Sequence, residues 1–244
     1  MSLRRALAIT GCVLVQSWAE AGPPFVTDDP ETPSPGGWEI NLPFVITRTD
    51  AATEMDVPLV DLNYGLPKLQ LSMDIPIRVS REDEDGGKAG LGDLLLGVKW
   101  RFLENARSQF QLAINPQWLV PTGDHSRGLG EGNTAFLFPV LAQNDFGRWK
   151  VYGNVGFWWQ TAAASRNYFY SGIALEREVS KRLTLGAELF GSSPKEQASR
   201  SEIAFNLGGA WKISDHFNLL FSGGRDLAGE VSAMGYIGVQ ILTR

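Results

Sequence analysis

The chain has 244 residues, a formal net charge of −5 and one cysteine. The acidic balance excludes a broad basic surface for nucleic acid, and a single cysteine excludes an internal disulfide. No later stretch approaches eighteen consecutive apolar residues, so the sequence predicts no transmembrane helix. The length suits one domain after an N-terminal targeting segment.

Met1–Ala21 has the features of a cleaved secretory signal peptide. Arg4 and Arg5 provide a positive start, a short apolar core follows, and Ala19-Glu20-Ala21 is an A-x-A cleavage pattern. The apolar core is too short to span a bilayer as a helix. Ile9-Thr10-Gly11-Cys12 resembles a lipoprotein box, but the apolar run continues past it, which favours cleavage after Ala21.

Residues 22–36 are expected to form an extended arm, because prolines in GPPFVTDDPETPSP exclude regular structure. The arm starts on the periplasmic side of the domain that follows. It either hangs free as an acidic tail or folds into that domain as a plug, and we favour the plug slightly. As a plug, the arm would bring Asp28, Asp29 and Glu31 to lumenal Arg or Lys side chains. Thr27 is the polar residue next to these acids and is included in the candidate site.

The segment Gln109–Val120 shows the pattern that dominates the rest of the chain. Its odd-numbered positions include Gln109, Gln111, Asn115 and Gln117, and its even-numbered positions are apolar or aromatic. Successive side chains of a strand point to opposite faces, so this segment has one polar and one apolar face. About twelve such segments are expected, near residues 37–48, 55–65, 68–80, 91–103, 109–120, 133–143, 149–161, 167–179, 183–192, 202–213, 217–225 and 233–243.

The connections between these segments alternate in length. Tight links near residues 66–67, 104–108, 144–148, 180–182 and 214–216 alternate with longer polar links near 81–90, 121–132, 162–166, 193–201 and 226–232. Bacterial outer-membrane barrels have short periplasmic turns and longer extracellular loops. An even number of strands then leaves both ends of the barrel domain in the periplasm.

The alternative fold is a secreted β-sandwich or a closed soluble barrel, in which the outer faces would be freely charged. Here the polar faces are rich in Gln, Asn, Ser, Thr and Gly, as in a crowded lumen. Six tryptophans lie near strand ends, which is typical of two aromatic girdles. Residues 37–244 are therefore predicted to form an all-β, antiparallel transmembrane β-barrel of about twelve strands in the bacterial outer membrane.

The polar faces then line the lumen. The side chains expected to tune the passage of solutes are Asp74, Arg78, Asp93, Lys99, Arg101 and Glu188. Charges of both signs inside a narrow barrel pair across it, so they either only stabilise a closed interior or form a selective constriction. These two interpretations are left open. A barrel of this strand number is too narrow for a wide water-filled pore.

Catalytic and metal sites have little support. Asp124-His125-Ser126 lies in a glycine-rich loop that does not hold a base rigidly, so solvated loop residues are favoured over a hydrolase dyad. The acidic run Arg81–Asp85 resembles a cation-binding loop, yet such loop tips are usually only solvated. No cofactor, metal site or catalytic residue is therefore expected.

Two segments resemble one family of outer-membrane proteins, labelled "MetA-pathway of phenol degradation". They are GPPFVTDDPETP followed by GGWEI, and GLGDLLLGVKWRFL, in which Gly92, Asp93, Leu96, Gly97, Lys99, Arg101 and Phe102 match the family's strand pattern. The resemblance implies a barrel transporter for aromatic or other small hydrophobic compounds. The chain departs from many outer-membrane barrels in ending on Thr243-Arg244 rather than on an aromatic residue.

The sequence thus predicts a non-enzymatic outer-membrane channel that takes up or releases small solutes passively. The expected partners are that solute, outer-membrane lipid with lipopolysaccharide, and the barrel-assembly machinery. The alternatives are a closed structural or adhesion barrel with partner-binding loops and, less favoured, an outer-membrane hydrolase acting through His125.

Overall fold

The computed structural model of the chain describes residues 22–82, 87–162, 165–196 and 199–243. The predicted signal peptide, with Cys12, and most of the acidic run Arg81–Asp85 lie outside the described residues. No helix in these ranges is long and apolar enough to cross a membrane.

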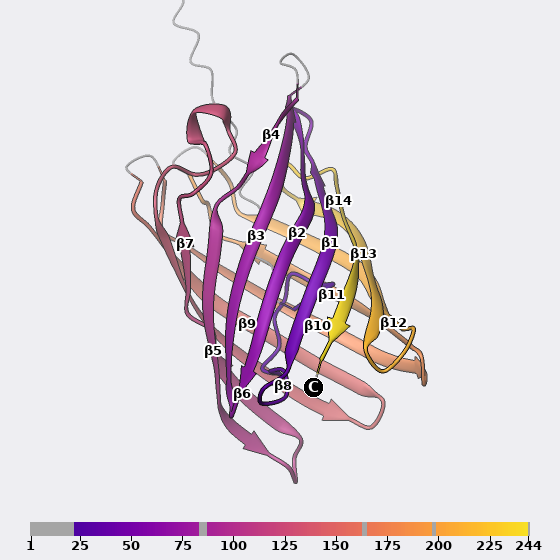
Figure 1. Cartoon of the computed structure of the whole chain (residues 1–244). Helices are drawn as coiled ribbons and strands as arrows, with labels where there is room; N and C mark the ends of the chain where they lie inside the picture. The colour runs from indigo at the N-terminus through magenta and orange to yellow at the C-terminus, as the bar shows by residue number, and fades with distance from the viewer. Residues whose placement is uncertain (1–21, 83–86, 163–164, 197–198, 244) are drawn as a thin grey trace, which may run out of the picture.

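Strands dominate the fold, and neighbouring strands in the described residues pair antiparallel (Figure 1). The described residues also contain a short 3-10 helix, η1 (His125–Arg127). The strands are β1 (Trp38–Arg48), β2 (Ala52–Leu66), β3 (Leu69–Glu82), β4 (Lys88–Leu91), β5 (Leu94–Asn105), β6 (Phe110–Ile114), β7 (Gln117–Val120), β8 (Ala135–Phe146), β9 (Trp149–Gln160), β10 (Tyr168–Ser180), β11 (Leu183–Ser192), β12 (Glu202–Lys212), β13 (Phe217–Ala228) and β14 (Ala233–Leu242).

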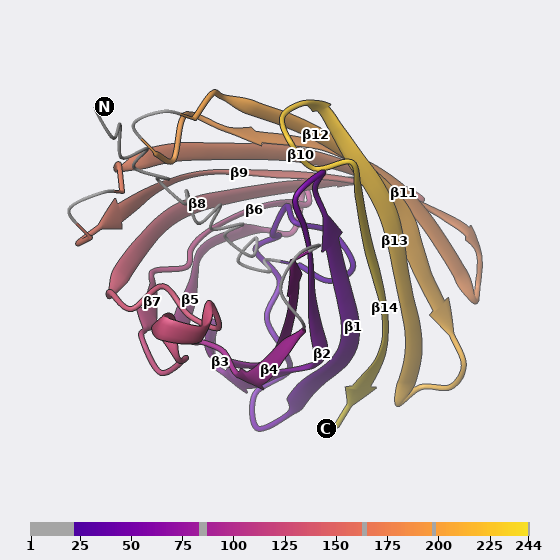
Figure 2. The same cartoon turned by 90° about the horizontal axis from the view of Figure 1, so that it is seen from above.

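The sheet closes into a barrel, as predicted. β1 pairs with β14, and the remaining strands pair in sequence around the ring (Figure 2). In the part of the chain that the structure describes, twelve strands make the barrel wall. The short strand β4 is in line with β5, because both pair with β3. The short strand β7 is in line with β6, because both pair with β5 and with β8. Closure leaves no open sheet edge, which a lipid-facing sheet cannot tolerate.

Two expected strands are interrupted in the structure. The segment predicted at residues 91–103 breaks at Gly92-Asp93, and the one predicted at 109–120 breaks at Asn115-Pro116. Proline has no backbone N–H for the ladder, and Asp93 instead accepts hydrogen bonds from the following loop. Gln109 was also predicted in a strand but lies in the preceding turn, with a φ of 55°.

Loop lengths alternate around most of the barrel, but two links at the loop end are short. The turn end carries the tight β2–β3, β8–β9 and β10–β11 links, and the loop end carries the long segment between β7 and β8. The short loop-end links are β1–β2, residues 49–51, and β13–β14, residues 229–232, which was expected to be longer. In the β1–β2 link the Thr49 hydroxyl accepts hydrogen bonds from the backbone N–H groups of Ala51 and Ala52, which shortens the turn and lengthens β2.

The outer surface is an apolar band, as predicted from the alternating pattern. Phe44, Val155 and Leu207 are each more than half exposed, as lipid-facing side chains must be when no lipid is present. At the loop end, the rings of Trp118, Phe136 and Trp159 adjoin one another across three strands, with centroids 6.3 and 5.9 Å apart. Such rings match an aromatic girdle at the membrane interface.

Candidate functional site in the barrel lumen

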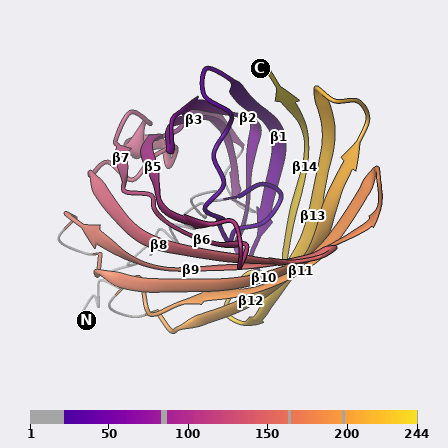
Figure 3. The ribbon, with the colours of Figure 1, turned by 90° about the horizontal axis from the view of Figure 1, so that it is seen from below.

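The N-terminal arm lies inside the barrel. Figures 2 and 3, which look along the barrel, show this indigo segment within the ring of strands. Phe25 is 2% exposed and packs in a cluster with Tyr152 and Ala174 on the lumenal face. Gly172 of β10 makes room for the arm, because a Cβ there would overlap the Thr27 hydroxyl. The arm and the wall are therefore closely packed at this level.

Glu188 of β11 binds the arm backbone. Its carboxylate accepts hydrogen bonds from the N–H groups of Val26 (2.9 Å) and Thr27 (2.8 Å), and also from the Asn206 amide (2.8 Å). Glu188 is 3% exposed, so these bonds replace the water that a buried carboxylate loses. On another strand, the Ser222 hydroxyl donates to the Pro24 carbonyl oxygen at 2.6 Å.

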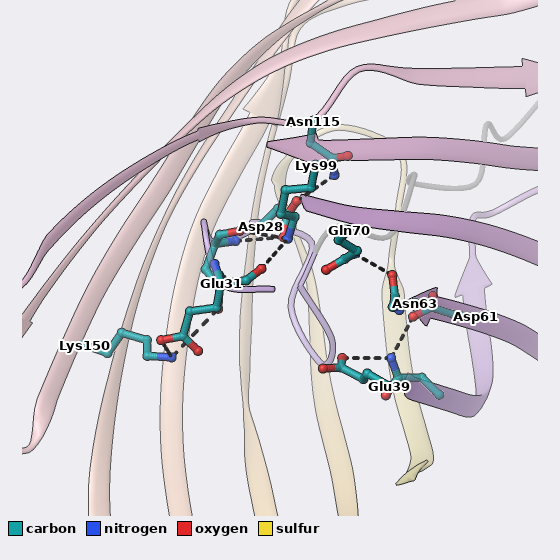
Figure 4. Close-up of polar contacts among 11 residues, drawn as sticks. Asp28, Glu31, Glu39, Asp61, Asn63, Gln70, Lys99, Asn115 and Lys150 are labelled. Atoms are coloured by element: carbon teal, nitrogen blue, oxygen red, sulfur yellow. Dashed lines mark hydrogen bonds and ion pairs between the residues drawn. The ribbon is translucent and has the colours of Figure 1, made fainter. Parts of the chain in front are cut away.

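Lys99 of β5 binds the arm from the opposite part of the wall. Its Nζ lies 2.7 Å from the Asp28 carboxylate and also donates to the carbonyl oxygens of Asp29 (2.9 Å) and Glu31 (3.3 Å). Asn115, at the interruption between β6 and β7, donates to the second Asp28 oxygen at 3.0 Å (Figure 4). Extra hydrogen bonds of this kind are what allow a buried ion pair to offset its desolvation cost.

A third contact holds the arm where it leaves the middle of the lumen. Lys150 of β9 lies 2.9 Å from the Glu31 carboxylate and 3.9 Å from that of Asp29. The Gln143 amide also donates to Glu31 at 2.8 Å. The arm acids therefore meet lumenal lysines, from β5 and from β9.

A second polar network consists of hydrogen bonds between lumenal side chains of β1, β2 and β3. Asn41 donates to the carboxylates of Glu39 (3.2 Å) and Asp61 (2.7 Å). Asn63 donates to Asp61 at 2.6 Å, and Gln70 donates to Asn63 at 2.6 Å (Figure 4). This chain of side chains from three adjacent strands makes that side of the lumen acidic and hydrogen-bonded.

The other lumenal residues named from the sequence have separate surroundings. Arg78 pairs with Asp56 at 3.0 and 3.2 Å. Asp74 lies opposite Asp61 in the β2–β3 register. Arg101 contacts Gln111 at 3.1 Å and, more loosely, Glu104 at 3.8 Å, near the turn end. The structure thus brings Lys99 and Glu188 to the arm and leaves Arg78 and Arg101 at different heights of the lumen.

Asp93 organises the long loop between β7 and β8. Its two carboxylate oxygens accept the backbone N–H groups of Gly123 (2.8 Å) and Glu131 (2.6 Å). These two hydrogen bonds hold the loop in place at the loop end of the barrel, where Glu131 lines the lumenal cavity. Burial, and then the adjacent Asp93 carboxylate, raises the pKa of Glu131.

A cavity of ≈ 120 Å³ lies between the arm and this loop. Much of its wall is apolar and aromatic, including Leu95, Leu119, Trp158 and Tyr168. Leu95, Trp158 and Tyr168 belong to one buried cluster, completed by Ala135 and Leu137, which face the same interior. One side of the lumen near the loop end is therefore apolar, which the alternating pattern did not predict.

Strict alternation of polar and apolar residues does not predict this apolar wall. Leu95 lies within the unbroken run Leu94-Leu95-Leu96, and Trp158 precedes the outward-facing Trp159. Both are places where two adjacent apolar residues break the alternation and one of them must face inward. Adjacent apolar pairs were the signal that could have located the wall.

The candidate catalytic loop does not form a relay. The His125 Nδ1 lies 3.1 Å from the Gly130 carbonyl oxygen. That hydroxyl donates to Asp124 at 2.6 Å and lowers the pKa of that exposed carboxyl. A nucleophile bonded to the acid, with the imidazole turned to a carbonyl, lacks the geometry for base-assisted attack.

A closed twelve-stranded wall with an apolar outer band and a polar, filled lumen defines an outer-membrane β-barrel of the porin and channel type. The chain belongs to the family described as "Putative MetA-pathway of phenol degradation", whose model matches residues 24–237. No curated protein matches the chain in sequence.

Solved structures of outer-membrane channels share the fold. The COG4313 outer membrane channel from Pseudomonas putida F1 superposes with a TM-score of 0.74 at 17% identity, covering 88% of this chain and 98% of that one. The NanC porin superposes with a TM-score of 0.62 at 8% identity, covering 83% and 98%. The KdgM porin bound to disordered oligogalacturonate gives 0.56 at 12% identity, covering 83% and 98%. At these identities the likeness concerns the fold.

Proposed function

We propose that this protein is a passive outer-membrane channel for small solutes that include aromatic or hydrophobic compounds. The observation that carries the proposal is the apolar cavity between the arm and the β7–β8 loop, with Trp158 and Tyr168 in its wall. Ligand sites for apolar molecules are concave and lined by such side chains. Family membership and the shared fold of outer-membrane channels also support it.

In this proposal the arm is a plug below the cavity. Lys99 and Glu188, on different strands, hold Asp28 and the backbone of Thr27, so the arm is docked across the lumen. A solute enters from the loop end, buries its apolar surface in the cavity, and passes when the arm moves. The driving force is the solute gradient, and no reaction is required.

The lumenal polar groups have distinct roles here. Lys99 and Glu188 hold the plug, Asp93 positions the loop, and Arg78 and Asp74 line the cavity. Arg101 lies nearer the turn end, where it tunes passage after the plug. The wall faces outer-membrane lipid, the loops face lipopolysaccharide, and insertion depends on the barrel-assembly machinery.

The first test compares two adjacent tryptophans of β9. Trp158→Ala removes a ring from the cavity, and Trp159→Ala removes a lipid-facing ring of the same size as the matched control. Uptake of radiolabelled phenol is measured into vesicles with a lipopolysaccharide outer leaflet. We expect Trp158→Ala to slow uptake severalfold and Trp159→Ala to leave it near the unmodified rate.

The second test is planar-bilayer conductance of the mature protein with and without residues 22–35. Discrete channels that widen without the arm support a plugged pore. A folded barrel that carries no current in either form and takes up no phenol contradicts the channel. That outcome favours a closed structural barrel whose loops bind partners, for which the buried Lys99–Asp28 pair is the supporting observation.

A further inference from the structure

The cavity above the arm has an unusual charge for an apolar site. Among the described residues that line it, the charged side chains are Arg78 and five carboxylates. The carboxylates are Glu54, Asp56, Asp74, Asp93 and Glu131. Arg78 forms an ion pair with one of them, Asp56. A low-dielectric wall beside an excess of negative charge strengthens the field that a bound cation experiences.

The lining also offers a cluster of hydrogen-bond acceptors. Ionised carboxylates only accept hydrogen bonds. Asn206, also in the lining, is 4% exposed; its amide nitrogen donates to Glu188, and its buried Oδ1 has no partner. A buried acceptor without a partner costs free energy until a donor reaches it. The complementary ligand is therefore a hydrogen-bond donor.

The apolar part of the same cavity supplies the other half of the ligand. Trp158 and Tyr168 form a stacked pair with ring centroids 6.1 Å apart, next to Leu95 and Leu119. Aromatic faces attract organic cations as well as apolar groups. An aromatic wall, an acidic rim and an unpaired acceptor occur together in one cavity.

We propose that this cavity selects amphipathic organic cations, molecules with an apolar or aromatic body and a protonated amine. The body lies against Trp158 and Tyr168, and the ammonium group faces the carboxylate side, where Glu131 reaches over the cavity from the loop. The inference rests on the proposed function and narrows it. Neutral phenols bind the wall alone, and aromatic carboxylates are repelled.

The test uses three probes with the same aromatic body: 2-phenylethylammonium, 2-phenylethanol and phenylacetate. Binding to the refolded mature protein is measured by isothermal titration calorimetry at pH 7. We expect the ammonium to bind about tenfold more tightly than the alcohol, and the carboxylate to bind most weakly. Equal affinities, or a preference for the carboxylate, would overturn the inference without any variant.

Variants assign the preference to the cavity. Glu131→Gln should reduce the ratio of ammonium to alcohol affinity about threefold to fivefold, the range of a partly exposed ion pair. Glu230→Gln makes the same charge change at an exposed loop position and should leave the ratio unchanged. A ratio that falls equally in both variants would show a general charge effect and contradict the site.

This binding experiment is separable from the proposed function. Phenol uptake without ammonium preference would overturn the inference and leave the channel proposal standing. Ammonium-selective binding without uptake of any probe would support the site and contradict the channel.

Discussion

Lys99 and Asp28, 71 positions apart in the sequence, form a 2.7 Å ion pair in which both side chains are about 95% buried or more. One residue belongs to the barrel wall and the other to the arm. The pair therefore fixes the Asp28 part of the arm to the wall at β5. Removing one member of such a pair leaves a buried charge without its partner, which costs ~3–5 kcal/mol.

Lys99→Ala should release the arm and raise the single-channel conductance. Without its partner, the buried Asp28 carboxylate is less stable in the lumen than in water. Planar-bilayer recording measures this. Arg101→Ala is the companion variant, since Arg101 contacts Gln111 and Glu104 rather than the arm. It should change ion selectivity with a smaller change in conductance. Unchanged conductance and selectivity in both proteins would eliminate the constriction hypothesis.

Gly172→Ala should displace the arm without disrupting the wall. The added methyl group overlaps the Thr27 hydroxyl, and overpacking of this kind costs ~1–3 kcal/mol. Hydrogen exchange at the Val26 and Thr27 amides, which donate to Glu188, should become faster. Gly223→Ala is the control, because the nearest atom to its Cβ is 3.7 Å away. Protected arm amides in Gly172→Ala would argue against close packing there.

Asp56→Ala should destabilise the barrel by ~3–5 kcal/mol, since it leaves the buried Arg78 without that carboxylate. Replacing both residues, as Asp56→Leu with Arg78→Met, should cost less because neither member of the pair is left charged without the other. Urea unfolding in detergent gives both values. Lys212→Ala, which breaks an exposed pair with Asp215, should change the stability far less, because exposed pairs are screened by water. Equal losses in the single and double variants would refute the argument.

Glu131→Gln should stabilise the protein at neutral pH. The folded-state pKa of Glu131 is raised above the ordinary value of 4.5, chiefly by burial and then by Asp93. The cost of the charged form is therefore present above the raised pKa and disappears as the pH falls to 4.5 and below. We expect a gain of about 1 kcal/mol or less at pH 7 and none near pH 3.5.

Urea midpoints at the two pH values measure the effect of Glu131→Gln. Glu230→Gln serves as the control, since its exposed side chain has no comparable burial. A gain that persists unchanged at pH 3.5 would mean that the glutamine acts through packing rather than through the lost charge.

The sequence predicted the barrel because membrane strands leave a local signal. Lipid on one side of the wall and the lumen on the other impose a two-residue period on every strand, and Phe44 and Leu207 lie on the expected outer face. The same period assigned Lys99 and Glu188 to the inner face. It failed where strands break: Pro116 has no backbone N–H for the ladder, and Asp93 bonds to the distant β7–β8 loop instead.

What a lumenal side chain contacts was decided only by the tertiary structure. Alternation assigns a residue to a face, but the partner across the lumen depends on barrel closure, strand register and the path of the arm. Glu188 meets Thr27 across 161 positions, and Trp158 and Tyr168 meet Leu95 only in the closed ring. The sequence alone determined that the wall is a transmembrane β-barrel, because contact with lipid constrains each strand locally. The plug and the cavity required the whole fold, because they consist of contacts between distant segments.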